Sequence, residues 1–136
     1  MRQTIAVPDG LAPPRIRDGG IAYSHVVIAS GRKLIYVAGQ LARDANGTIA
    51  GKGDMAAQIR QVCENIRLAL TAAGASFADV VETTTYVTNM GEFMRHAAVR
   101  VEYFGSEPPT STTIGISQLA DPDAMIEIRV TAVVDG

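Results

Sequence analysis

The sequence predicts an α+β fold in which two helices cover one face of a single β-sheet. Two segments repeat their apolar residues at steps of three and four, which is the period of an α-helix. The other apolar segments are rich in β-branched residues, which favour extended strands. Along the chain the predicted order is strand, strand, helix, strand, helix, strand, strand.

Two strands come first, in the stretch "AYSHVVIASGRKLIYVAGQL". We expect them at Ser24–Ala29 and Lys33–Gln40, separated by a short segment that holds Gly31. Two β-rich runs joined by a short glycine-containing segment are typical of a β-hairpin. The sequence therefore predicts that these two strands pair with each other.

The first helix follows Asp54, which can cap its N-terminus, and Gly74 can end it. A second helix is expected over residues 89–105, after a β-branched strand in 78–88. Asn89 followed by Glu92 resembles a capping box, and Gly105 supplies the stop. The apolar stripes of the two helices are Met55, Ile59, Val62, Cys63, Ile66, Ala69, Leu70 and Ala73, and Met90, Phe93, Ala97, Val101 and Phe104.

The last two strands are expected in "PPTSTTIGIS", residues 108–117, and "AMIEIRVTAVV", residues 124–134. Alternate side chains of a strand point to opposite faces, so the final strand has one apolar face and one mixed face that carries Glu127 and Arg129. Ser111 and Thr113 belong to a small polar row, which we expect on the same uncovered face. Because a face of this size needs a partner, self-association would bury it and enclose polar clefts.

Composition indicates one globular domain, residues 1–136, with 47% hydrophobic and 19% charged residues. The net charge of −2 and the scattered basic residues predict that the protein does not bind nucleic acid. No apolar run approaches the roughly 20 residues of a membrane span, so no membrane association is expected. The N-terminal segment lacks the apolar stretch of a signal peptide and Cys63 has no disulfide partner, which predicts a cytoplasmic protein.

The stretches "AYSHVVIASGRKLIYVAGQL", "GDMAAQIRQVCENIRLALTAAGASFADVVETTTYVTNMGEF" and "MIEIRVTAV" resemble the Rid family of reactive intermediate deaminases. These proteins are also called YjgF-like and, under an older label, L-PSP endoribonucleases. The resemblance runs from Tyr23 almost to the C-terminus. It implies a chorismate-mutase-like fold, a homotrimer with its sheets packed inward, and small-molecule clefts at the subunit interfaces.

The resemblance also implies a reaction. Rid proteins hydrolyse short-lived enamines and imines to 2-keto acids and ammonia, without a metal or an organic cofactor. An arginine of one subunit holds the substrate carboxylate, while a glutamate with its water assists addition to the imine carbon.

Matched residue by residue, Tyr23 corresponds to the tyrosine near the cleft and Gly39 to the glycine of the strand that ends "GQ". Glu127, in "IEI", corresponds to the water-positioning glutamate. Ser111 stands where the family has its arginine. Thr113, two positions further on, stands where the family has a small residue. A hydroxyl cannot neutralise a carboxylate, so we expect a substrate that is less anionic or larger than a 2-imino acid.

Each of these residues also has a plain structural alternative. Glu127 could form an ion pair with Arg129, which could itself supply the missing cation or form an exposed pair at the strand end. Ser111 and Thr113 could hydrogen-bond only within their strand. The sequence leaves these alternatives open.

The remaining titratable candidates are interpreted as structural. His25 and His96 have no second ligand at metal-binding spacing, so no metal site is predicted. Cys63 lies on the apolar stripe of the first helix, which favours a buried and inert thiol.

Three functions follow from these observations. The first is an enzyme that hydrolyses an enamine, an imine or a related C–N metabolite, with Glu127 as its catalytic residue. The second is a non-catalytic metabolite-binding or regulatory trimer that uses the same cleft. The third, an endoribonuclease or translation inhibitor, ranks last because the sequence has neither a basic groove nor a histidine pair for acid–base cleavage.

Overall fold

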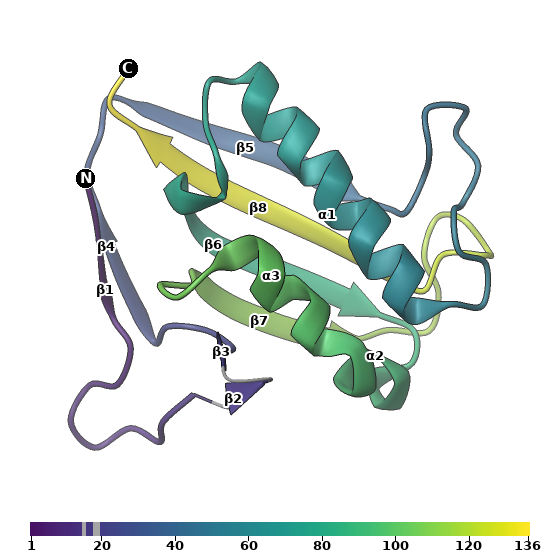
Figure 1. Ribbon diagram of the computed structural model, residues 1–136, viewed down its shortest axis with the longest axis horizontal. Coiled ribbons are helices and arrows are strands. Elements are labelled where there is room, and N and C mark those ends of the chain that lie inside the picture. The colour runs from purple at the N-terminus through teal and green to yellow at the C-terminus, as the bar shows by residue number, and fades with distance from the viewer. Residues whose placement is uncertain (15, 18–19) are drawn as a thin grey trace.

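The computed structural model describes residues 1–14, 16–17 and 20–136 (Figure 1). The helical elements are α1 (Met55–Ala72), η1 (Phe77–Asp79), α2 (Met90–His96), η2 (Ala97–Arg100) and α3 (Val101–Phe104), where η1 and η2 are 3₁₀ turns. The strands are β1 (Arg2–Ile5), β2 (Ile16–Arg17), β3 (Gly20–Ile21), β4 (Val26–Ala29), β5 (Lys33–Gln40), β6 (Val80–Val87), β7 (Thr110–Gly115) and β8 (Ile126–Val134).

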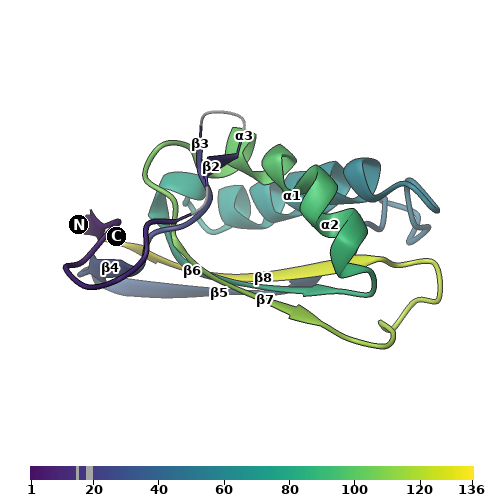
Figure 2. The ribbon, with the colours of Figure 1, turned by 90° about the horizontal axis from the view of Figure 1, so that it is seen from below.

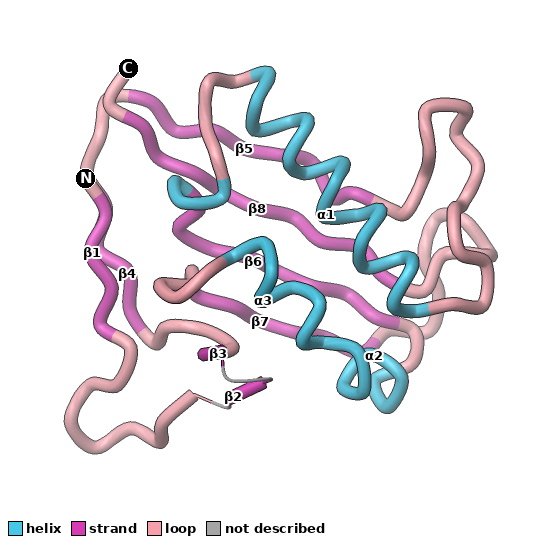
Figure 3. Tube along the Cα trace, viewed as in Figure 1, coloured by secondary structure: helices cyan, strands magenta, loops and turns pink. Residues whose placement is uncertain are grey.

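The central sheet is four-stranded and has the order β5-β8-β6-β7. β8 is antiparallel to both of its neighbours, whereas β7 pairs with β6 in parallel. β1 and β4 form a separate two-stranded sheet beside the central one, as Figure 3 shows, and β2 pairs with β3. Parallel pairing requires a crossover connection, and here α2, η2 and α3 provide it.

The helices all lie on one face of the central sheet and leave the other face open (Figure 2). The α+β fold predicted from the sequence is therefore confirmed. Within the described part of the chain, no helix is long and apolar enough to cross a membrane. The core lies between the helices and the sheet, and the alternation predicted for β8 is confirmed on its apolar side, where the buried residues are Ile126, Ile128, Val130 and Ala132.

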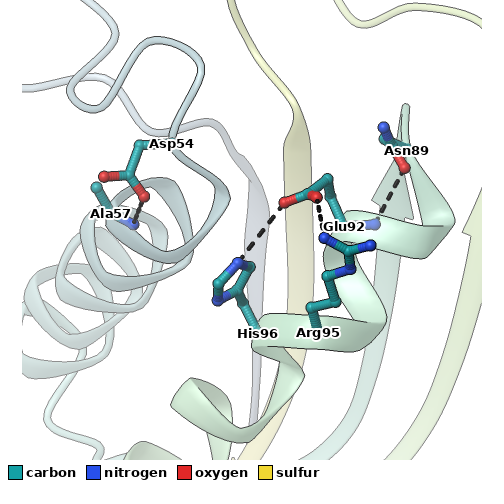
Figure 4. Close-up of polar contacts among 6 residues, drawn as sticks. All are labelled: Asp54, Ala57, Asn89, Glu92, Arg95 and His96. Carbon is teal, nitrogen blue, oxygen red and sulfur yellow. Dashed lines mark hydrogen bonds and ion pairs between the residues drawn. The ribbon is translucent and has the colours of Figure 1, made fainter.

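The predicted N-caps at Asp54 and Asn89 are confirmed, whereas the carboxylate of Glu92 contacts later residues of its own helix (Figure 4). An Asp54 carboxylate oxygen accepts a hydrogen bond from the Ala57 amide at 3.0 Å, and the Asn89 side chain accepts one from the Glu92 amide at 3.0 Å. The Glu92 carboxylate lies 3.4 Å from the Arg95 guanidinium and 3.6 Å from His96 Nε2, so its ion pairs are made within α2 itself.

The predicted hairpin between Ser24–Ala29 and Lys33–Gln40 is wrong. β4 pairs with the N-terminal strand β1, and β5 pairs with the C-terminal strand β8. The Arg32 amide already donates to the Val134 carbonyl at 3.0 Å, so the chain has changed partner before β5 begins. Local composition identifies a strand, but the choice of partner depends on distant segments, since β4 pairs with the N-terminal residues Arg2–Ile5 and β5 pairs with the C-terminal strand β8.

The second predicted helix is not continuous, because the 3₁₀ turn η2 separates α2 from α3. No glycine or proline between residues 92 and 104 marks this change of pitch. The predicted stripe nevertheless faces the core at Phe93 and Ala97, which are buried, and the chain leaves α3 at Gly105 with a φ of +75°. A 3₁₀ turn shifts the phase of the side chains that follow it.

Gln58 is fully buried in α1 and connects this helix to two loops. Its Nε2 donates to the carbonyls of Gly51 at 3.1 Å and Asp123 at 2.9 Å, and its Oε1 accepts from the Met125 amide at 2.8 Å. These bonds fix the segment that enters β8, the strand that carries Glu127.

Replacing Gln58 should destabilise the protein because it removes the side-chain partner of the Asp123 carbonyl and the Met125 amide, whereas the Gly51 carbonyl still accepts a hydrogen bond from the Asp54 amide. We expect Gln58→Ala to lower the free energy of unfolding by about 2–4 kcal/mol. Urea denaturation at a fixed protein concentration measures this. The control is Gln61→Ala, since Gln61 bonds to Asn65 on the same helix. Equal losses in the two variants would contradict the role given to Gln58.

Candidate functional site

The pairing register decides which side chains share a face of the sheet. Thr85 of β6 lies opposite Thr113 of β7 and opposite Ile128 of β8. Ile128 is buried in the core beneath the helices, and directly paired residues point to the same face. Thr113 and Ser111, which precedes it by two residues, therefore point toward the helix layer.

Glu127 points the other way. It lies opposite Tyr86, and Arg129 lies opposite Thr84, so both charged side chains belong to the open face. The prediction that Ser111 and Thr113 share the uncovered face with Glu127 is therefore wrong. Alternation within a strand can be predicted from the sequence, but the phase between two strands is set by their register.

On the open face the structure brings Gly39 and Glu127 together. A Cβ atom on Gly39 would lie 2.6 Å from Glu127 Oε2 and 2.7 Å from its Cδ, so only glycine leaves room for this carboxylate. Gly39 lies where the β5–β8 register shifts between Val37 and Gln40, as at a β-bulge. The half-buried Glu127 side chain therefore packs directly against the backbone of β5.

Arg129 is exposed on the same open face and lines a shallow hollow with Tyr36, Glu82 and Thr131. Among the ion pairs of the described residues, none joins Arg129 to Glu127. Because Ser111 points to the opposite face, Arg129 cannot take the place of a cation at Ser111 within one chain.

Ser111 lines a small pocket between the sheet and the end of the second helical segment. Its enclosed volume is about 10 Å³, which is room for about one water molecule. The polar side chains that line it are Thr83, Ser111 and Arg100, and the apolar residues of the lining are Ile21, Ala22, Ala97, Val101, Phe104 and Pro109.

Arg100 is the charged residue among those that line this pocket, and the sequence analysis missed it. Its side chain is nine-tenths buried, with 9% of the residue's surface exposed. Nη1 donates to Thr85 Oγ1 at 3.1 Å, and the guanidinium carbon lies 5.0 Å from the centre of the Phe93 ring, a cation–π distance. A signal was available, because Arg100 comes seven residues after Phe93 and three after Ala97, on the apolar stripe itself.

Tyr23 belongs to the segment that covers the same pocket. The Ser24 amide donates to the Pro109 carbonyl at 3.1 Å, which attaches this segment to the start of β7. The half-buried Tyr23 ring packs edge-on against His25, with 5.3 Å between the ring centres, and His25 Nε2 lies 2.6 Å from the Ala12 carbonyl oxygen. His25 thus has a local structural contact, in line with its interpretation.

Cys63 is fully buried in α1, and burial raises the pKa of its thiol to about 12. The thiol is therefore protonated at neutral pH, in agreement with the inert role predicted for it. Among the described residues, no three His, Cys, Asp or Glu side chains are grouped so that they could hold a metal ion.

The structure is an α+β protein with helices on one face of its sheet and Glu127 packed against Gly39 of the next strand, as expected for the Rid/YjgF type that the sequence resembles. The chain belongs to the family described as Endoribonuclease L-PSP, whose model matches residues 19–134. The resemblance identified from the sequence is thereby confirmed.

Relatives from three organisms cover most or nearly all of the chain. The crystal structure of a Yersinia pestis protein of the conserved Rid family, YyfB, has a TM-score of 0.85 and 34% identity and covers 98% of both chains. A protein named 3-aminoacrylate deaminase RutC from Acinetobacter baylyi is 32% identical over 132 residues, 97% of this chain and 98% of the relative. A RutC family protein of Pyrococcus horikoshii is 37% identical over 110 residues, 81% of this chain and 85% of the relative.

Substituting Gly39 tests the packing of Glu127. In Gly39→Ala the new Cβ would collide with the carboxylate, which is the flexible end of the Glu127 side chain, so we expect Glu127 to move away from β5 and stability to fall by no more than about 1 kcal/mol. A crystal structure and urea denaturation of the variant measure both effects. Gly115→Ala is the control, because a Cβ there meets the Met90 side chain at an ordinary 3.7 Å. An unmoved Glu127 in Gly39→Ala would refute the contact.

Proposed function

We propose that the protein is a deaminase-type hydrolase of an enamine, an imine or a related C–N metabolite. The observation that carries the proposal is the Glu127 carboxylate, half-buried on the open face against the backbone at Gly39. Family membership and the name of the Acinetobacter baylyi relative, a deaminase, support it.

In the proposed reaction Glu127 accepts a hydrogen bond from a water molecule and directs its oxygen at the imine carbon. An enamine first becomes the imine by taking up a proton on carbon and losing one from nitrogen. Addition of water forms the new C–O bond, and the proton that the water loses to Glu127 passes to the nitrogen, which gives a carbinolamine. The C–N bond then breaks as the proton of the new hydroxyl group is transferred to the nitrogen, which releases ammonia and leaves the carbonyl product, so no electron donor or acceptor is required.

We further propose that the cleft forms between copies of the chain in a homotrimer. Ser111 and Glu127 face opposite sides of the sheet, so a single chain cannot present both to one small ligand. The open face also exposes Leu34 at 61%, Tyr36 at 75% and Ile114 at 40%, and a second copy would cover these side chains. Sedimentation equilibrium measures the number of copies.

Ser111 limits the substrates that this cleft can accept. A charge-assisted contact to a carboxylate contributes roughly 1.5–3 kcal/mol, and a serine hydroxyl cannot replace it. We therefore propose that 2-imino acids are poor substrates and that the ligand is less anionic or larger. No cofactor is required for this chemistry, and the cytoplasmic location stays a prediction.

The catalytic proposal is tested with Glu127→Gln, which keeps the shape of the side chain and removes its charge. We expect turnover of an enamine generated in situ to fall by about 10²–10⁴-fold, because the water loses its general base. Ammonia release measures this, and Glu107→Gln, in an exposed loop, is the control. Unchanged turnover in Glu127→Gln would overturn the mechanism. If the native protein shows no turnover but ligands raise its Tm, the non-catalytic metabolite-binding function is correct instead.

The role of position 111 is tested with 2-iminopropionate, generated by an amino-acid oxidase and trapped competitively by semicarbazide. We expect Ser111→Arg to increase its hydrolysis by about tenfold or more, as a restored charge-assisted contact would. If the native protein is already as active as the variant, Ser111 does not limit the use of 2-imino acids.

A further inference from the structure

We propose that Arg100 binds the anionic end of the ligand in this cleft, in place of a cation at position 111. The inference rests on the proposed function for the identity of the cleft. It assigns a specificity-determining residue and a substrate class, namely carboxylates whose charged group reaches inward past Ser111.

The position of Arg100 follows from its hydrogen bond and from the register of the sheet. Nη1 is bound to Thr85 on β6, and Thr85 lies opposite Thr113 on β7. Adjacent strands are about 4.8 Å apart, so the guanidinium lies over β6, about one strand further in than the edge strand that carries Ser111. The positive charge of Arg100 therefore lies deeper in the pocket than the charge of an arginine at position 111 of β7 would.

The pocket suits a single anionic oxygen. Most of its lining is apolar, and Thr83 and Ser111 place hydroxyl groups beside the guanidinium. An apolar lining lowers the local dielectric constant and strengthens a charge-assisted hydrogen bond. The enclosed volume of about 10 Å³ holds one water-sized atom, so a carboxylate oxygen can replace a water while the rest of the ligand lies outside, next to Ser111.

Arg100 is also preorganised for binding. Thr85 Oγ1 and the Phe93 ring are among its partners, and together they fix the guanidinium at the sheet and over one aromatic face. A group held in its bound position loses less conformational entropy when the ligand arrives. A long side chain that is nine-tenths buried meets this condition better than an exposed arginine would.

The depth of Arg100 sets the length of the ligand. Under the proposed function the C–N group lies in the inter-subunit cleft, outside Ser111. In a 2-imino acid the carboxylate is attached to the C–N carbon itself, so it is too close to that group to reach Arg100 as well. A ligand with further carbons between its carboxylate and its C–N or carbonyl carbon can span this distance. The substrate class is therefore an enamino or imino acid with a more distant carboxylate, and its product is the corresponding oxo acid.

The test compares two stable product analogues, pyruvate and levulinate, by calorimetric titration of the native protein at constant ionic strength. Both carry one ketone and one carboxylate, and they differ in the number of carbons between these groups. We expect levulinate to bind at least tenfold more tightly than pyruvate, and neutral 2-pentanone to bind no better than pyruvate. We expect Arg100→Gln to weaken levulinate binding at least tenfold, whereas Arg95→Gln, an exposed arginine of the preceding helix, leaves it unchanged.

Because Arg100 is buried, Arg100→Gln could fail to fold. Ser111→Asp then tests the same role by blocking Arg100 instead of removing it. Its carboxylate would pair with Arg100 inside the pocket and exclude the ligand, while Ser106→Asp adds the same charge in an exposed loop. We expect at least a tenfold loss of levulinate affinity in Ser111→Asp and none in Ser106→Asp. Compared with Ser111→Arg alone, the double variant Arg100→Gln with Ser111→Arg should lose affinity for levulinate and keep its affinity for pyruvate, whereas a merely structural role for Arg100 would lower both affinities.

Levulinate binding that survives both Arg100→Gln and Ser111→Asp would overturn the inference, as would equal affinity of the native protein for levulinate and pyruvate. These outcomes are independent of the catalytic proposal, since equilibrium binding needs no turnover. Arg100-dependent binding in a protein without turnover supports the inference and refutes the hydrolase. Turnover that requires Glu127, in a protein whose ligand binding does not depend on Arg100, supports the hydrolase and refutes the inference.

Discussion

The double pairing of β6, parallel to β7 on one side and antiparallel to β8 on the other, determines the chemistry of both faces of the sheet. Thr85 lies between Thr113 and Ile128, and Tyr86 lies between Ile114 and Glu127. A slip of one residue in either pairing would exchange the faces of a whole strand. The hydroxyl groups of β7 would then leave the helix side, and Glu127 would enter the apolar core.

Much of the fold could be predicted from the sequence because its signals are local. The stripe of α1, the caps at Asp54 and Asn89 and the alternation of β8 depend on residues a few positions apart. The partner of β4 could not be predicted, since it is the N-terminal strand β1. The shared face of Ser111 and Glu127 was predicted wrongly for a related reason, because the phase between neighbouring strands is a property of their pairing.

In the candidate site, too, some residues could be identified from the sequence and others needed the structure. Gly39 and Glu127 were identified through family motifs, and the structure adds that a side chain at position 39 would displace the carboxylate. Arg100 belongs to no motif quoted for the family resemblance. Its place on the apolar stripe was a signal in the sequence, and its contacts to Thr85 and Phe93 show that its charge lies inside the fold.

The crossover between the parallel strands β6 and β7 has a consequence for how this protein can diverge. Arg100 is carried by that connection, whereas Glu127 is carried by β8 on the far side of the sheet. Under the proposed function, changes in the connection or in the first residues of β7 alter which ligand is selected without disturbing the water-activating carboxylate. Selection of new metabolites and retention of the hydrolytic step are thus separable evolutionary events in this architecture.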